Sequence, residues 1–174
     1  MKPAEAVLKF LKSVGRESEA DFYLRLFLAT VPESFAAIAV EESTLELSSD
    51  AVALDLRFLT ELGLTPLVVV GLHESGQPQA YAEGLANALR SARVAIRLLQ
   101  PDADETRVAS LLRSGTIPIL PLPEPDERSR YHGLGRLLSA LRTRKLIFLL
   151  PEGGLRCGGE LGSVVNLSRQ LEWL

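Results

Sequence analysis

Apolar residues along this chain alternate between helical spacing and short continuous runs. Val52, Leu56 and Leu59 recur on one face of a helix predicted from Asp50 to Gly63, and an all-apolar strand follows at 66–71. The same alternation continues to position 150, with predicted strands at 35–40, 66–71, 94–98, 117–122 and 145–150. Five strands alternating with helices predict an α/β fold with a mostly parallel, doubly wound sheet.

Two local features refine this prediction between positions 100 and 141. Asp102 with Glu105 has the spacing of a capping pair, so we expect a helix from there to Arg113. Prolines and charges crowd 121–130, which predicts an exposed loop. A further helix is expected from the leucines that follow it, at Leu134, Leu137, Leu138 and Leu141.

The first 31 residues have a helical pattern of their own. Four apolar residues at helical spacing end at Gly15, and a second stripe follows after position 22. These stripes are formed by Val7, Phe10, Leu11 and Val14, and by Tyr23, Leu26 and Phe27. We therefore expect a helical pair at 1–31 and an α/β domain at 32–174. The first stripe can bind a neighbouring subunit or pack on its own domain.

The last predicted strand is followed by a turn and a short hairpin. The run 145–150 is continuously apolar after Lys145, as expected of a parallel strand that is covered on both faces. Gly153 and Gly154 then allow a sharp turn before the hairpin. Because ligands of α/β sheets bind beyond the carboxyl ends of strands, this turn lies where a ligand is expected.

The segment 145–167 resembles the "Lys-Ile-Ile-Phe-Leu … Gly-Gly-Leu … Asn-Leu" stretch of the amino-acid kinase domain in N-acetylglutamate kinases and synthases. Further blocks resemble the same family in the same order, with particular similarity to its vertebrate-like synthase and bifunctional branch. These blocks are 7–15, 23–27, 35–40, 53–63 and 67–72. The resemblance implies an amino-acid-kinase fold, phosphoryl transfer from ATP to acetylglutamate, and a role in arginine biosynthesis.

The residues that hold phosphate in that family are largely replaced here. Its lysine after the first strand aligns with Ala39, and the two glycines that follow align with Glu41 and Glu42. Two carboxylates would repel a triphosphate, and the backbone cannot approach it closely. In place of the family's Asn-x-Asn-Ala-Asp segment the chain has 130–136, and the shortened middle, 77–114, has no counterpart of its acetylglutamate-binding arginine.

What remains of the family's nucleotide site is a vestigial set, with no catalytic residue and no bound metal expected. The set consists of Gly71, Lys145, Gly153 and Gly154. The sequence stops at Leu174, where the family continues with more of its nucleotide pocket, and no acetyltransferase domain follows. We therefore expect a degenerate, truncated domain, a pseudokinase without a cofactor.

The composition of the chain limits which kinds of partner and which location we expect. The chain has 174 residues, 47% of them hydrophobic, and a formal net charge of -3 with mixed signs. The length and hydrophobic content are sufficient for one core. Because the net charge is small and its signs are mixed, neither nucleic acid nor a membrane is expected as a partner. One cysteine, Cys157, excludes an internal disulfide, and no apolar run is long enough to span a bilayer or to serve as a signal peptide. A cytoplasmic location is expected.

Other chemistry-bearing residues are expected to be incidental. His73 with Glu74, together with the distant His132, lacks metal-ligand spacing, and Cys157 has no nearby base. The pair at 41–42 can be a cation site, although two carboxylates after a strand are more often solvated. The Gly-Leu-Gly at 133–135 lacks the preceding strand of a dinucleotide fingerprint.

The sequence thus favours a degenerate N-acetylglutamate kinase/synthase-type domain with a structural or regulatory role. Two alternatives stay open: a residual acetylglutamate kinase that uses ATP and Mg²⁺, and a scaffold that docks a separate N-acetyltransferase. Homo-oligomerisation through the amino-terminal helices is expected by resemblance to the family's hexameric and synthase members.

Overall fold

The computed structural model describes residues 35–73, 76–143, 145–151, 156–157 and 160–161. The predicted helical pair at 1–31 and the turn at Gly153 and Gly154 lie outside these ranges, so the proposed domain division stays a prediction.

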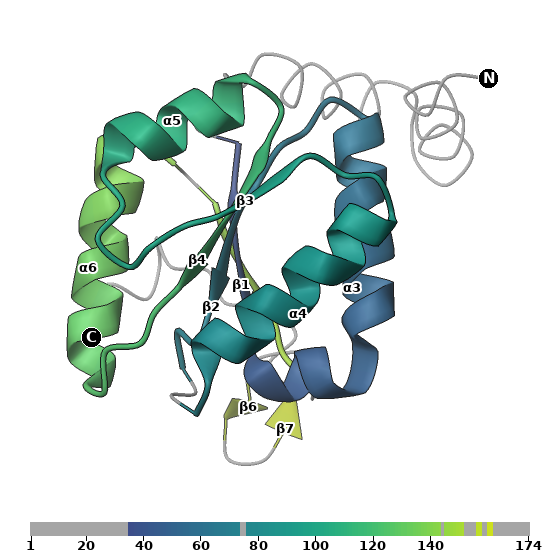
Figure 1. The fold of residues 1–174 in the computed structure, drawn as a ribbon. Helices are drawn as coiled ribbons and strands as arrows, with labels where there is room; N and C mark the ends of the chain where they lie inside the picture. Colours follow the sequence, from purple (N-terminus) through teal and green to yellow (C-terminus); the bar gives the residue numbers. More distant parts are fainter. Residues whose placement is uncertain (1–34, 74–75, 144, 152–155, 158–159, 162–174) are drawn as a thin grey trace, which may run out of the picture.

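Five parallel strands form the central sheet, in the order β3-β4-β2-β1-β5 (Figure 1). Their bounds are β1 Ala37–Val40, β2 Leu67–Val70, β3 Ile96–Leu98, β4 Ile117–Pro121 and β5 Leu146–Leu149. A separate two-stranded antiparallel pair, β6 (Arg156–Cys157) with β7 (Glu160–Leu161), confirms the short hairpin.

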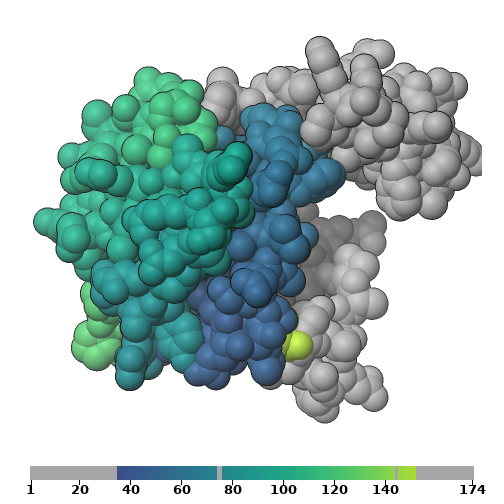
Figure 2. All heavy atoms as spheres, turned by 45° about the vertical axis from the view of Figure 1, so that its right-hand side comes forward, coloured from purple at the N-terminus to yellow at the C-terminus, as the bar shows by residue number. Residues whose placement is uncertain are grey.

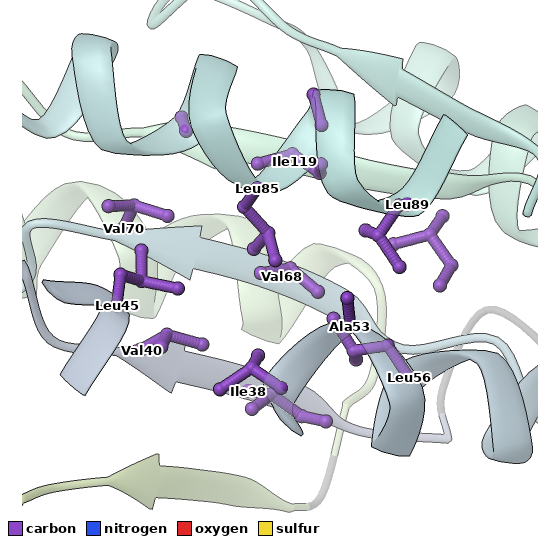
Figure 3. Close-up of a cluster of buried hydrophobic side chains, with 14 of the residues drawn as sticks. Ile38, Val40, Leu45, Ala53, Leu56, Val68, Val70, Leu85, Leu89 and Ile119 are labelled. Carbon is purple, nitrogen blue, oxygen red and sulfur yellow. The ribbon is translucent and has the colours of Figure 1, made fainter. Parts of the chain in front are cut away.

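Helices cover both faces of the sheet (Figure 1). One face packs on α3 (Glu42–Glu61) and α4 (Pro78–Ser91), and the other on α5 (Glu105–Arg113) and α6 (Glu127–Ala140). Because side chains alternate along each strand, Ile38 and Val68 face the first helical pair, as Figure 3 shows, while Ala39 and Val69 face the second. The α/β, doubly wound prediction is confirmed.

The last strand differs from its prediction. It was expected to be buried on both faces, but Leu146 is 36% exposed and Ile147 is 42% exposed. The reason is position: within the described sheet β5 pairs only with β1, so it forms an edge. A continuous apolar run does not distinguish an edge strand from a central one.

The first helix of the α/β alternation starts earlier than predicted. α3 begins at Glu42, not at Asp50, and its backbone leaves helical geometry at Ser48, with φ -149° and ψ 32°. The predicted helix matches the part after this kink. The earlier part was missed because its apolar pattern is interrupted by polar residues, although Leu45 is buried.

Aspartates that the sequence analysis did not single out cap both α5 and α6. α5 is capped by Asp104, whose side chain accepts from the Arg107 amide, so the predicted pair of Asp102 with Glu105 is wrong. α6 already begins at Glu127, within the predicted loop 121–130, and its cap is Asp126. The side chain of Asp126 accepts from both the amide and the hydroxyl of Ser129, at 2.8 and 2.6 Å.

We expect the cap of α6 to be lost in acid. The bonds from Ser129 hold the pKa of the Asp126 carboxyl below its ordinary value, so the folded state favours the charged form. This stabilisation is present above the unfolded-state pKa and is lost as the pH falls through the lowered folded-state pKa. The melting temperature of Asp126→Asn should therefore lie below that of the wild type at neutral pH and approach it as the pH falls well below the ordinary carboxyl pKa of 3.8. A constant difference across pH 2 to 7 would contradict this.

Candidate functional site

The carboxyl ends of β1, β2 and β4 meet at one edge of the sheet, where α/β proteins bind ligands. Glu41 and Glu42 follow β1 and start α3, and Gly71 follows β2 with φ 81°. A left-handed φ of this kind suits glycine, so the chain turns sharply after β2. This edge is therefore the candidate site.

Both carboxylates after β1 are buried, which corrects the expectation that they are solvated. Glu41 is 2% exposed and Glu42 is 6% exposed. The backbone carbonyl of Glu41 accepts from the amides of Thr44 and Leu45, both at 3.1 Å, so this residue opens the first turn of α3. Negative charge at a helix amino terminus is favourable, which offsets part of the cost of burial.

Glu42 reaches across the edge to the start of α4. Its Oε2 accepts from the backbone amide of Gln77, the residue that caps α4, at 2.9 Å. A Cβ built at Gly76 would lie 2.5 Å from the same oxygen, so glycine allows the carboxylate to come this close. The amino terminus of a helix after a glycine turn is an ordinary position for a bound phosphate. Here a carboxylate of the chain occupies it.

Arg130 holds the two loops of this edge together. Its side chain is buried, and it donates to the carbonyls of Leu72, His73 and Glu124 at 2.9, 3.1 and 2.6 Å. The loops after β2 and after β4 are thus joined through one guanidinium. The sequence had placed Arg130 in an exposed loop, and this was wrong. Asp126 with Ser129 three residues later is a helix-start signal that could have found it.

Tyr131, the next residue of α6, has a phenol whose pKa is affected by the charges of the candidate site. Burial raises the pKa of its phenol, and the negative charges of Glu127 and Glu41 raise it further. Glu41 follows β1 and Tyr131 lies on α6, so the electrostatic influence of the buried carboxylate extends to the α6 side of the edge.

Two members of the predicted vestigial nucleotide set, Gly71 and Lys145, lie within the described residues and are found at opposite edges of the sheet. Lys145 precedes β5, its carbonyl accepts from the Ala37 amide, and its Nζ lies 5.8 Å from the centre of the Phe35 ring. It therefore lies at the amino edge, whereas Gly71 lies at the carboxyl edge. About five strand residues separate the two registers, on the order of 16 Å. Gly153 and Gly154 fall outside the described residues.

The remaining candidates lie apart from one another. His73 Nδ1 is 3.0 Å from Glu127 Oε1, and both side chains are more than half exposed. His132 is exposed on α6, and the glycines at 133 and 135 lie inside that helix. Nowhere in the described ranges do three His, Cys, Asp or Glu side chains gather as metal ligands would. None of the helices described has the length and apolar character that a bilayer crossing requires.

The fold and this edge define an α/β domain with a doubly wound parallel sheet, consistent with the amino-acid-kinase fold that the sequence resembles. No protein-family model matches the chain. Over 67 residues the chain is 36% identical to "Protein arg11, mitochondrial" of Schizosaccharomyces pombe. The match covers 38% of this chain and 8% of that protein, so it spans a small part of the relative.

Replacing Arg130 should destabilise the domain. Arg130→Met leaves three carbonyls at the carboxyl edge without their donor, and we expect a loss of about 2–4 kcal/mol in the free energy of unfolding. Arg130→Lys should recover only part of it, because one ammonium lacks the planar fork that serves three acceptors. Arg136→Met, an exposed change on the same helix, is the control. Chemical denaturation measures the stability of all three variants. Equal denaturation midpoints for Arg130→Met and Arg136→Met would contradict the role of Arg130 in joining the two loops.

The contact between Glu42 and Gly76 predicts a coupled pair. Gly76→Ala places a methyl group against Oε2, so the end of the Glu42 side chain must move away from the Gln77 amide, which should cost about 1 kcal/mol of stability in the wild type. In a Glu42→Ala background there is no carboxylate to displace, so most of this cost should disappear as a coupling between the two changes. Gly84→Ala, in α4 with open space around its Cβ, is the control and should stabilise by about 1 kcal/mol. Additive effects in the cycle would contradict the contact.

Proposed function

We propose that this chain is a degenerate amino-acid-kinase-type domain of the N-acetylglutamate kinase/synthase kind, with a structural or regulatory role and no phosphoryl transfer. The observation that carries the proposal is the contact between Glu42 Oε2 and the Gln77 amide at 2.9 Å. A kinase needs this kind of backbone position for a phosphate, because phosphoryl transfer depends on positioning and on neutralising charge.

Electrostatics supports the same conclusion. Two unit charges of like sign 4 Å apart repel by about 4 kcal/mol at an effective dielectric constant of 20. Both Glu41 and Glu42 are buried at this edge, and Arg130 gives its donors to backbone carbonyls. A polyphosphate would meet two carboxylates here, so anion binding at this edge is disfavoured.

The link to arginine biosynthesis has two supports. One is the resemblance of several ordered blocks to N-acetylglutamate kinases and synthases, and the other is the likeness to arg11 over 67 residues. Both concern ancestry, and neither depends on the chemistry of the site. A role in arginine biosynthesis is therefore proposed separately from the loss of phosphoryl transfer.

The alternative functions have less support. A residual acetylglutamate kinase would rely on Lys145, which lies at the opposite edge of the sheet from Glu42 and Gly71. A scaffold that docks a separate N-acetyltransferase stays a prediction from the resemblance. The cytoplasmic location also stays a prediction, since the name of the relative includes "mitochondrial".

Ligand binding tests the proposal directly. In thermal-shift measurements, millimolar ATP with Mg²⁺ or inorganic phosphate should leave the melting temperature of the wild type unchanged. Glu42→Ala removes the carboxylate from the start of α4, so this variant should gain a phosphate-dependent rise. Glu46→Ala removes an exposed carboxylate from the same helix and should behave like the wild type.

Two outcomes would count against the proposal. Phosphorylation of acetylglutamate by the wild-type protein would show that the site is active. A phosphate-dependent shift of equal size in the wild type and in Glu42→Ala would show that the carboxylate does not exclude anions.

A further inference from the structure

The outer face of α3 carries two large apolar side chains that lie outside the core of the domain. Leu54 is 61% exposed and Phe58 is 46% exposed. Both come after the kink at Ser48 and are four residues apart in the regular part of the helix, so their side chains are neighbours on one helical face. We call these two residues the α3 patch. This side of the molecule is turned forward in Figure 2, where α3 is blue.

The α3 patch lies in an acidic surface. Asp50 and Asp55 are exposed on the same part of α3, and neither makes an ion pair with a described residue. Glu61 is exposed as well and pairs with Arg57, the one basic residue of this helix. A surface that covers the α3 patch should therefore have room for apolar side chains and carry positive charge.

A hollow with room for such side chains lies on the other face of the sheet, over α6 and the start of α5. Its volume is about 760 Å³, and several small residues line it, namely Ala103, Gly133, Gly135 and Ala140. A Cβ built at either glycine would meet nothing within 4 Å, so the space above this part of α6 is open. We call this space the α6 hollow.

The surface around the α6 hollow is basic. Arg128, His132 and Arg136 recur every four residues on the exposed side of α6, and the last two line the hollow itself. None of the three has an ion-pair partner in the part of the chain that the structure describes. Glu105 also lines the hollow, so two arginines stand against one carboxylate. The α6 hollow thus complements the α3 patch in shape and in charge.

The α3 patch and the α6 hollow lie on opposite sides of the domain. α3 covers one face of the sheet and α6 covers the other, as Figure 1 shows. The α3 patch of one chain therefore cannot enter its own hollow, whereas the hollow of a second copy is accessible to it. A contact of this kind is head to tail, because each copy contributes a different surface.

We propose that the α3 patch of one chain docks in the α6 hollow of a second copy. Leu54 and Phe58 enter the space above the two glycines, and the acidic residues of α3 face Arg128 and Arg136. Further copies can add in the same way unless the assembly closes into a ring. This interface differs from the one expected for the amino-terminal helices, and it does not rest on the function proposed for the carboxyl edge.

Sedimentation velocity of the full chain measures the association. The average mass of the wild type should rise between about 1 and about 300 µM, as for other small interfaces, and high salt should weaken the rise because the facing charges are exposed. Leu54→Gln/Phe58→Gln removes the α3 patch, and Gly135→Gln fills the α6 hollow. Each should weaken the association by about tenfold or more. A wild type that stays monomeric over this range would overturn the proposal.

Matched control variants separate a lost contact from a lost fold. Gly84→Gln changes another helical glycine that has open space around its Cβ, and Ala80→Gln changes an exposed residue of the same helix, α4. Both variants should associate like the wild type. Glutamine favours a helix more than glycine does, so neither glycine change should lower the melting temperature. An equal loss of association in Gly135→Gln and Gly84→Gln would overturn the role of the hollow.

Mixing two variants tests whether the contact is head to tail. Leu54→Gln/Phe58→Gln keeps the α6 hollow, and Gly135→Gln keeps the α3 patch. Each variant alone should be largely monomeric, and an equimolar mixture should form dimers that grow no further. Dimers of Gly135→Gln alone would show that the α3 patch binds the α3 patch of a second copy, and a monomeric mixture would show that patch and hollow do not meet. Either result would overturn the proposal.

Discussion

The contact between the Glu42 carboxylate and the amino terminus of α4 is the constraint around which the carboxyl edge is arranged. It joins the start of the first helix after β1 to the start of the helix after β2, and these two helices pack together over one face of the sheet. The helix dipole makes this position favourable for negative charge, whatever group supplies it. In this protein the Glu42 side chain supplies the negative charge, so a group of the chain itself occupies the amino terminus of α4.

Arg130 makes the complementary contact with the opposite polarity. Carbonyls at the ends of strands need donors, and a buried guanidinium provides several in a fixed plane. The carboxylate thus satisfies a helix amino terminus while the guanidinium satisfies loop carbonyls. Satisfaction is not complete, since the buried Glu42 Oε1 has no hydrogen-bond partner among the described residues.

Patterns dominated by burial were predictable from the sequence, and long-range polar contacts were not. The strands at 66–71 and 117–122 were found because continuous apolar runs reflect coverage on both faces. The burial of Glu41, Glu42 and Arg130 was missed, since charged residues are ordinarily exposed. The Gln77 amide that Glu42 binds lies 35 positions away, and two of the carbonyls that Arg130 binds lie 57 and 58 positions away. A helix cap depends on one local hydrogen bond. The sequence therefore shows that an aspartate can cap such a helix, but it does not tell Asp104 apart from a neighbour such as Asp102.

The exposed large apolar side chains of this domain are concentrated on one flank of the sheet. Of the six large apolar side chains exposed in the described part of the chain, five lie on α3 and β5. These elements are neighbours, because both lie against β1 and the Thr44 hydroxyl donates to the Leu149 carbonyl at 2.9 Å. The carboxyl edge, in contrast, is filled by charges that satisfy backbone groups of the same chain. The structural contrast within this domain is therefore between an edge whose polar groups are held by its own charged side chains and a flank that leaves large apolar side chains exposed.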